Sequence, residues 1–154
     1  QPGPIVNLEG KVLGEHRGLH LYTLGQRKGL RVASNLYKQA YVVVAKRQKT
    51  NELVIAIERP DTPLLWAQRA VLSDISWTGE ALTQKSRLQA MPRYRSPAAN
   101  ATFRPFQREG GWAAELIFDE PQRALTPGQI CALYDGEVRL GGAFFEMIDH
   151  GPAA

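Results

Sequence analysis

Short segments in which apolar and polar residues alternate, separated by glycine, proline and aspartate turns, make up most of this 154-residue chain. Alternation with a period of two is typical of β-strands that bury one face. Helical periodicity is weak throughout, and only residues 26–33 and 62–66 have a composition that allows a short helix. Because several short strands at close spacing favour small barrels, the sequence predicts a mainly β protein.

The alternation predicts two hairpins early in the chain and a longer series of strands after them. One hairpin joins residues 5–7 to 11–13, and a second joins residues 41–46 to 52–57. The later strands are numerous enough to close an antiparallel barrel. They are expected at residues 69–77, 87–95, 101–107, 112–118, 130–134, 138–140 and 143–148.

Two details of the later strands follow from their residues. The spacing of Val71, Ile75 and Trp77 is even-numbered, so these side chains are expected on one face of the first of them. Gly141 and Gly142 are expected to interrupt the last strand, because glycine weakens a strand interior.

A domain boundary is expected near the breaker cluster Asp-Thr-Pro at residues 61–63. Residues 1–68 then form a first small β-rich domain, which contains a pair of glycine-rich loops. Residues 69–150 form the β-barrel, and residues 151–154 form a frayed tail.

Composition places the chain among globular proteins of the cytoplasm. It is 44% hydrophobic and 22% charged, and it contains neither a signal-peptide pattern nor an apolar run near the ~20 residues that a membrane span needs. The first residue is Gln1 rather than Met, as in an excised fragment. The single cysteine, Cys131, excludes an internal disulfide and a Cys-x-x-Cys zinc site, and it is expected to be a small buried hydrophobe.

The positive charge of the chain is concentrated rather than spread. The formal net charge is +4, and one stretch of basic residues contains no Asp or Glu. A stretch of one sign repels itself unless an anion compensates it, so it is either a solvated strand face or a phosphate-contacting patch. Its members are Lys85, Arg87, Arg93, Arg95, Arg104 and Arg108.

The loop GQRKG at residues 25–29 combines two glycines with Arg27 and Lys28. Glycines allow close backbone approach, and a guanidinium beside an ammonium suits a phosphate or a sugar-phosphate backbone. An ordinary surface turn has the same composition. The loop does not match the G-x-x-x-x-G-K-[ST] pattern of nucleotide-binding proteins.

His16 and His20 lie four residues apart, a spacing that binds metal on a helix. Gly14 and Gly18 interrupt any such helix, so no metal site is expected. His16 is expected instead to make a hydrogen bond that fixes its loop.

The tripeptide Arg93-Tyr94-Arg95 places two guanidiniums beside one aromatic ring. In an extended strand Tyr94 points away from the two arginines, and a core-facing tyrosine between exposed arginines is one interpretation. At a strand end or in a loop, ring and guanidinium reach one nucleotide together, which is how single-stranded RNA is held.

Gln129 follows Pro127-Gly128, a pair with type II turn chemistry, and its amide can donate and accept toward a base or ribose. Asp119-Glu120 is interpreted as a solvated strand end, because no nucleophile lies nearby in the sequence.

An ordered series of motifs along the whole chain resembles the bacterial tRNA-specific 2-thiouridylases, which place sulfur on a wobble uridine. The matching residues are Gly14-Glu15-His16, Gly18, Tyr22 to Leu30, Tyr41-Val42-Val43, Asn51, Arg93-Tyr94-Arg95, Phe118 to Glu120, Thr126 to Gln129, Tyr134-Asp135-Gly136 and Gly141-Gly142.

The resemblance implies that the chain is the C-terminal part of such an enzyme: all or most of its central domain, then a barrel similar to that of translation factors. It implies tRNA contacts at Arg93, Tyr94 and Gln129, which Arg95 is expected to join. A phosphate-contacting, RNA-contacting or interdomain loop is expected at His16, Gln26, Arg27 and Lys28.

The family's SGG-x-D-S nucleotide loop and its two catalytic cysteines have no counterpart in this sequence. The resemblance therefore implies no catalytic residue and no cofactor in the chain, which is expected to be inactive alone. The full-length enzyme would use ATP. Its partners would be tRNA, the N-terminal ATP-pyrophosphatase domain and a sulfur-donor protein, without a membrane. Two alternatives stay open: a free-standing barrel that binds protein, and a domain that binds small anions.

Overall fold

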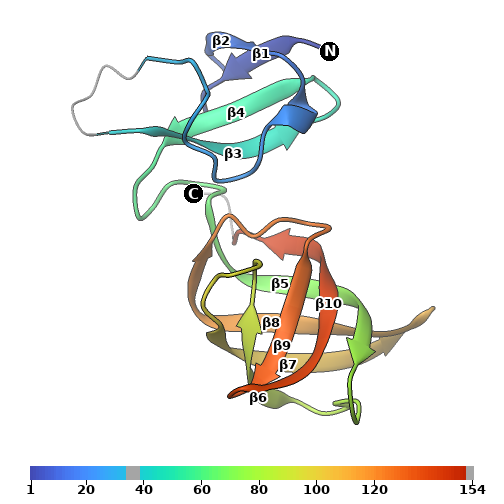
Figure 1. The fold of residues 1–154 in the computed structure, drawn as a ribbon. Coiled ribbons are helices and arrows are strands. Elements are labelled where there is room, and N and C mark those ends of the chain that lie inside the picture. The colour runs from blue at the N-terminus through green and yellow to red at the C-terminus, as the bar shows by residue number, and fades with distance from the viewer. Residues whose placement is uncertain (34–38, 152–154) are drawn as a thin grey trace. The chain divides into compact units, whose positions relative to one another are not determined.

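The computed structural model describes residues 1–33 and 39–151, and the chain divides into two compact units, Gln1–Trp66 and Ala67–Ala154 (Figure 1). Both units are built from strands, so the predicted mainly β fold is confirmed. The helices that the composition allowed at residues 26–33 and 62–66 do not form. The one helical element in the described ranges is a short 3-10 turn, η1 (Leu19–Leu21). Of the expected tail, only Gly151 lies within the described residues.

No helix in the part of the chain that the structure describes has the length and apolar character needed to cross a membrane.

The first unit is a four-stranded sheet in the order β2-β1-β4-β3. β1 (Gly3–Val6) and β2 (Val12–His16) form one antiparallel pair, and β3 (Tyr41–Arg47) and β4 (Glu52–Ile57) form the other. Both predicted hairpins are therefore confirmed. The two hairpins join in the middle of the sheet through a parallel pairing of β1 with β4. One cluster of buried core residues in this unit consists of Ile5, Leu19, Leu30, Val43, Leu53 and Ile55.

The second unit is a closed barrel in the order β10-β5-β8-β7-β6-β9, as the sequence predicted (Figure 1). Its interior is filled by alternating apolar side chains, among which Phe103, Phe118 and Phe145 are the largest. The strands are β5 (Trp66–Trp77), β6 (Ser86–Met91), β7 (Ala99–Arg108), β8 (Gly111–Arg123), β9 (Ile130–Asp135) and β10 (Val138–Asp149).

β10 runs without a break through Gly141 and Gly142, so the expected interruption is wrong. Gly141 is buried and pairs with Trp77 of β5 and with Leu133 of β9. A Cβ atom on Gly141 would lie 2.1 Å from the carbonyl oxygen of Ser76. Glycine is required here because the backbones of β5 and β10 approach closely, rather than because the strand ends.

The face of β5 that points into the barrel changes partway along the strand. Ala70 and Leu72 are buried, whereas Val71 lies outside the core cluster. Asp74 then adopts a left-handed φ of 50°, and the pairing with β10 shifts register at this point. A bulge of this kind inserts an unpaired residue and reverses the alternation. Ile75 therefore packs inward, and the prediction of one common face with Val71 is wrong.

Candidate nucleic-acid interface

The segment Arg93-Tyr94-Arg95 forms a tight turn, because β6 ends at Met91 rather than continuing to residue 95 as predicted. The backbone N–H of Ser96 donates to the carbonyl oxygen of Arg93 over 3.1 Å. The Ser96 hydroxyl donates to the same oxygen over 2.7 Å and accepts from the Arg93 N–H over 3.1 Å. These bonds fix the turn and place Tyr94 and Arg95 at its tip.

Tyr94 is 86% exposed, more than any other large hydrophobic side chain in the described ranges. The guanidinium carbon of Arg95 lies 5.3 Å from the centre of its ring. Arg95 itself holds a φ of 67°, the left-handed region that a type II turn needs at its third position and that glycine normally occupies. The tip therefore presents a solvated aromatic face with a cation beside it, a combination that can stack a base and attract a phosphate.

Arg93 anchors the turn to the end of β8. Its side chain is half-buried, and its Nη2 donates to the carbonyl oxygen of Ala124. Burial lowers the pKa of the Arg93 guanidinium, and the positive charge of Arg123 lowers it further. Arg123 lies thirty residues away in sequence, and no sequence signal marks it. Cations that repel one another at short range favour an anion between them.

Gln129 belongs to the loop in which the Ala124 oxygen accepts the hydrogen bond from Arg93. Thr126 donates from its hydroxyl to the Ala124 oxygen over 3.0 Å, and the Gln129 N–H donates to the Thr126 oxygen over 3.3 Å. Gly128 between them has a φ of 87°, as the predicted turn requires. The structure thus connects the segments of Arg93 and Gln129 through one loop. The Gln129 Oε1 atom is buried and accepts no hydrogen bond from the described residues.

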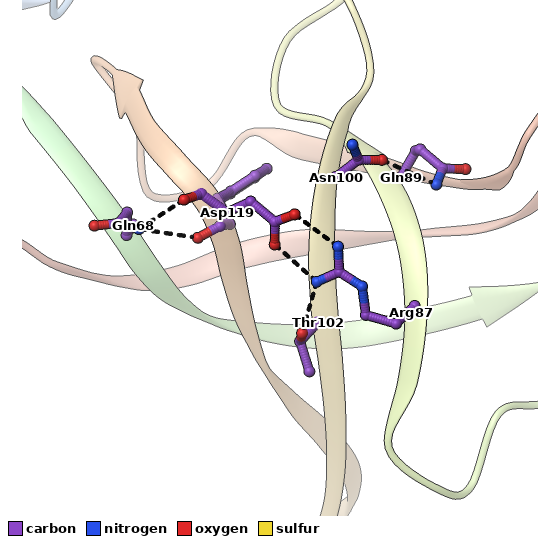
Figure 2. A network of polar contacts seen from close by, with 7 residues as sticks. Gln68, Arg87, Gln89, Asn100, Thr102 and Asp119 are labelled. Atoms are coloured by element: carbon purple, nitrogen blue, oxygen red, sulfur yellow. Dashed lines mark hydrogen bonds and ion pairs between the residues drawn. The ribbon is translucent and has the colours of Figure 1, made fainter.

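Carboxylates from other strands compensate half of the basic stretch. Arg87 forms a two-pronged ion pair with Asp119, at 2.7 and 2.6 Å, and also bonds to Thr102 over 3.0 Å (Figure 2). The Arg87 guanidinium holds the pKa of the Asp119 carboxyl below its usual range. Asp119 is exposed, as interpreted, but it lies inside β8 rather than at a strand end.

Two further arginines of the stretch are paired in the same way. Arg104 lies 3.7 Å from Glu115, and Arg108 bonds Glu146 over 2.6 Å. Arg87, Arg104 and Arg108 are therefore ion-paired within the barrel. Among the arginines of the stretch, those that best fit the predicted phosphate-contacting patch are therefore Arg93 and Arg95, in the turn after β6.

His16 is fully buried, and both of its ring nitrogens are used. Nδ1 accepts from the Gly18 N–H over 3.1 Å, which requires the proton on Nε2, and Nε2 donates to the Asn51 oxygen over 2.7 Å. The imidazole thus ties the loop after β2 to the turn between β3 and β4. A fully buried ring with both nitrogens occupied positions the loop and does not reach a ligand.

The GQRKG loop is held by its own contacts and by the edge of β3. Gly25 donates to the Val43 oxygen over 2.8 Å, and Val43 donates back to the Gln26 oxygen over 3.0 Å. The Gln26 side chain bonds backbone groups of Thr23 and Lys28. Arg27 is ion-paired with Glu58 at 2.8 Å, which raises the pKa of Arg27. Lys28 is the exposed side chain of the loop that has no polar partner among the described residues.

Cys131 is fully buried in the barrel core, and burial raises the pKa of its thiol to about 12. The thiolate is the reactive form, so the native chain contains almost none at pH 8. Ellman's reagent is therefore expected to label the folded chain negligibly over an hour and to label it fully in urea. Rapid labelling of the folded chain at pH 8 would contradict this placement of Cys131.

Models of known protein families match residues in both units of the chain. Residues 1–57 match the model of the tRNA methyl transferase PRC-barrel domain, and residues 67–145 match the model of the aminomethyltransferase β-barrel domain. The tRNA-specific 2-thiouridylase MnmA of Akkermansia muciniphila is 48% identical over 149 residues, which is 97% of this chain and 40% of that protein.

Other relatives agree. The tRNA-specific 2-thiouridylases MnmA of Moorella thermoacetica and of Neisseria meningitidis serogroup C are 43% and 42% identical, over 96% of this chain and 39% and 38% of their own lengths. The chain thus spans about two fifths of the relatives that it matches. With both domain models matched in order and similarity along nearly its whole length, the chain belongs to the tRNA-specific 2-thiouridylase family, of which it represents the C-terminal part.

Proposed function

We propose that this chain binds and positions tRNA for 2-thiolation of a uridine, the reaction named by its relatives. The observation that carries the proposal is the turn after β6, where Tyr94 is 86% exposed and Arg95 lies beside its ring. An aromatic side chain so exposed contributes nothing to the barrel core, but it offers a face on which a base stacks. Arg93, bonded to the Ala124 oxygen, holds this turn on the barrel.

The binding that we propose combines stacking with phosphate contacts. Arg95 supplies a phosphate contact near the Tyr94 ring, and Arg93 and Arg123 add positive charge at the base of the turn. Gln129 has an amide oxygen without a hydrogen bond, so it gains one if its amide turns toward a donor on the RNA. Because each phosphate contact releases counterions, the logarithm of the affinity should fall by about 0.7–0.9 per contact for each tenfold rise in salt.

The same proposal assigns separate roles to this chain and to the rest of the longer enzyme. ATP-dependent activation of the uridine and sulfur transfer belong to the part of the relatives that this chain does not match, and the chain alone is inactive and needs no cofactor. Its partners are tRNA, that catalytic part and a sulfur-donor protein, in the cytoplasm. The GQRKG loop serves as a contact to RNA or to the catalytic part through Lys28, since Arg27 is already paired with Glu58.

Replacing Arg95 by glycine is expected to move stability and binding in opposite directions. A side chain at a φ of 67° is strained, so Arg95→Gly should raise the free energy of unfolding by about 0.5–1 kcal/mol, the left-handed penalty less the extra entropy of glycine. The loss of the guanidinium should weaken tRNA binding several-fold. Urea denaturation and fluorescence anisotropy with labelled tRNA measure the two effects.

Arg31→Gly is the matched control, because Arg31 is also exposed and has a φ of 57° but lies in the first unit. It should gain stability without losing affinity. Equal affinity of the Arg95→Gly variant and the parent chain would remove Arg95 from the proposed interface. Equal losses in both variants would indicate that the charges of Arg95 and Arg31 contribute alike, so that Arg95 makes no specific contact at the turn after β6.

A further inference from the structure

A groove of ≈ 330 Å³ lies on the barrel where β5, β9 and β10 meet. Gly141 and Gly142 form part of its lining, and because the half-buried Gly142 has no side chain, its backbone forms part of the groove wall. The apolar lining comes from Trp77, Ile130 and Phe144. The size matches the lower end of pockets that bind small organic groups, which are mostly apolar with a few polar groups that fix orientation.

Two of the three apolar side chains of the groove, Ile130 and Phe144, are exposed and lie outside the barrel core, whereas Trp77 packs against it. Ile130 is 57% exposed and Phe144 is 40% exposed, and the two are direct partners across the β9–β10 pair. Neither belongs to the core cluster of the barrel. Together they form an exposed apolar pair in the groove against which a planar ring can pack.

The same groove is lined by a hydrogen-bond donor, Arg139, and by a hydrogen-bond acceptor, Asp74. Arg139 lies close to the bare backbone of Gly142, since a Cβ there would come within 3.3 Å of its guanidinium Nη2. Unlike Arg87, Arg104 and Arg108, Arg139 forms no ion pair with the described residues. Asp74 contributes a carboxylate that accepts hydrogen bonds. A nucleobase offers both donors and acceptors on its edge, and its ribose-phosphate offers an anion for a guanidinium.

The groove begins one residue away from Gln129. Ile130 follows Gln129 in the chain, and Phe144 precedes Phe145, whose backbone bonds the Gln129 oxygen over 2.9 Å and accepts from Gly128 over 2.7 Å. The loop that contains Gln129 also carries Ala124, the acceptor for Arg93. The groove and the Arg93–Gln129 region are therefore joined by a single continuous loop and strand pair.

We propose that this groove is a second RNA subsite, which takes one unpaired nucleotide of the same RNA that contacts Tyr94. The base lies against Ile130 and Phe144, and Arg139 contacts its edge or its phosphate. The proposal rests on the proposed function, because it assumes that RNA already occupies the turn after β6. An unpaired guanidinium and continuity with Gln129 favour a nucleotide over a protein segment as the occupant.

Arg139→Gln, which removes the charge and keeps most of the stem, tests the subsite in the full chain. One lost phosphate contact and weaker orientation of the base should lower the affinity for tRNA by about 5- to 10-fold. Gly142→Val, which narrows the groove, should weaken binding similarly. Arg104→Gln removes the same charge from an ion-paired site on the barrel and should leave the affinity within about twofold.

Chemical probing of the bound tRNA gives the second readout. One unpaired nucleotide should be protected by the parent chain and by Arg104→Gln, and should become reactive again with Arg139→Gln. If Tyr94→Ala weakens binding while Arg139→Gln and Gly142→Val do not, the subsite is overturned and the proposed function stands. If none of these variants changes binding, both are overturned. The subsite would also be overturned if the parent chain retained a protein partner that the Arg139→Gln variant released, while the two chains bound tRNA with equal affinity.

Discussion

Replacing Gly141 by alanine is expected to destabilise the barrel by about 2–4 kcal/mol, because the added methyl group has no space. Its Cβ would lie 2.1 Å from the Ser76 oxygen, 3.1 Å from the Ser76 carbonyl carbon and 3.2 Å from the Trp77 Cα. All three are backbone atoms, so β5 must move away from β10 to admit the methyl group. Urea denaturation followed by circular dichroism measures the change in the free energy of unfolding.

Gly142→Ala is the matched control at the neighbouring position. Its nearest neighbour would be the Arg139 guanidinium at 3.3 Å, which is the free end of a flexible side chain. The control is therefore expected to change the free energy of unfolding by less than about 0.5 kcal/mol. If Gly141→Ala were tolerated equally well, the close approach of β5 and β10 would be wrong.

The second large effect is expected on binding rather than stability. Tyr94→Ala removes a ring that is 86% exposed, so the unfolding temperature should stay within about 1 °C of the parent value. Stacking of one base on an aromatic ring contributes about 1–3 kcal/mol, so the affinity for tRNA should fall by about 5- to 150-fold. Fluorescence anisotropy at one fixed salt concentration measures this loss.

Tyr94→Phe separates stacking from hydrogen bonding, since it keeps the ring and removes only the hydroxyl. It is expected to bind tRNA within about twofold of the parent chain. Unchanged affinity of Tyr94→Ala would rule out stacking at this turn. A full loss in Tyr94→Phe would instead assign the contact to the hydroxyl.

The architecture was predictable because strand alternation is a local signal. The two early hairpins and the six-stranded barrel follow from apolar residues at every second position. Gly141 was misinterpreted because its requirement comes from Ser76, a neighbour 65 residues away that the local pattern does not reveal. The change of face in β5 depends on the left-handed φ of Asp74. The alternation of apolar and polar residues does not reveal that Asp74 adopts this backbone conformation.

The site was predictable in composition but not in geometry. Arg93, Tyr94 and Arg95 stand out by residue type, yet the sequence left open whether they lie in a strand or a turn. The pairing of Arg87 with Asp119 joins residues 32 positions apart, so only the folded barrel shows that this arginine is compensated. The same long-range folding brings Arg123 near Arg93, and nothing local predicts it.

The most direct test asks where RNA touches the chain. Ultraviolet cross-linking of tRNA to the 154-residue chain, followed by protease digestion and mass spectrometry, identifies the residues in contact. A turn that stacks a base on an exposed ring predicts a dominant cross-link at Tyr94, which disappears at high salt. Reproducible cross-links confined to other residues, with Tyr94 unmodified, would contradict the account.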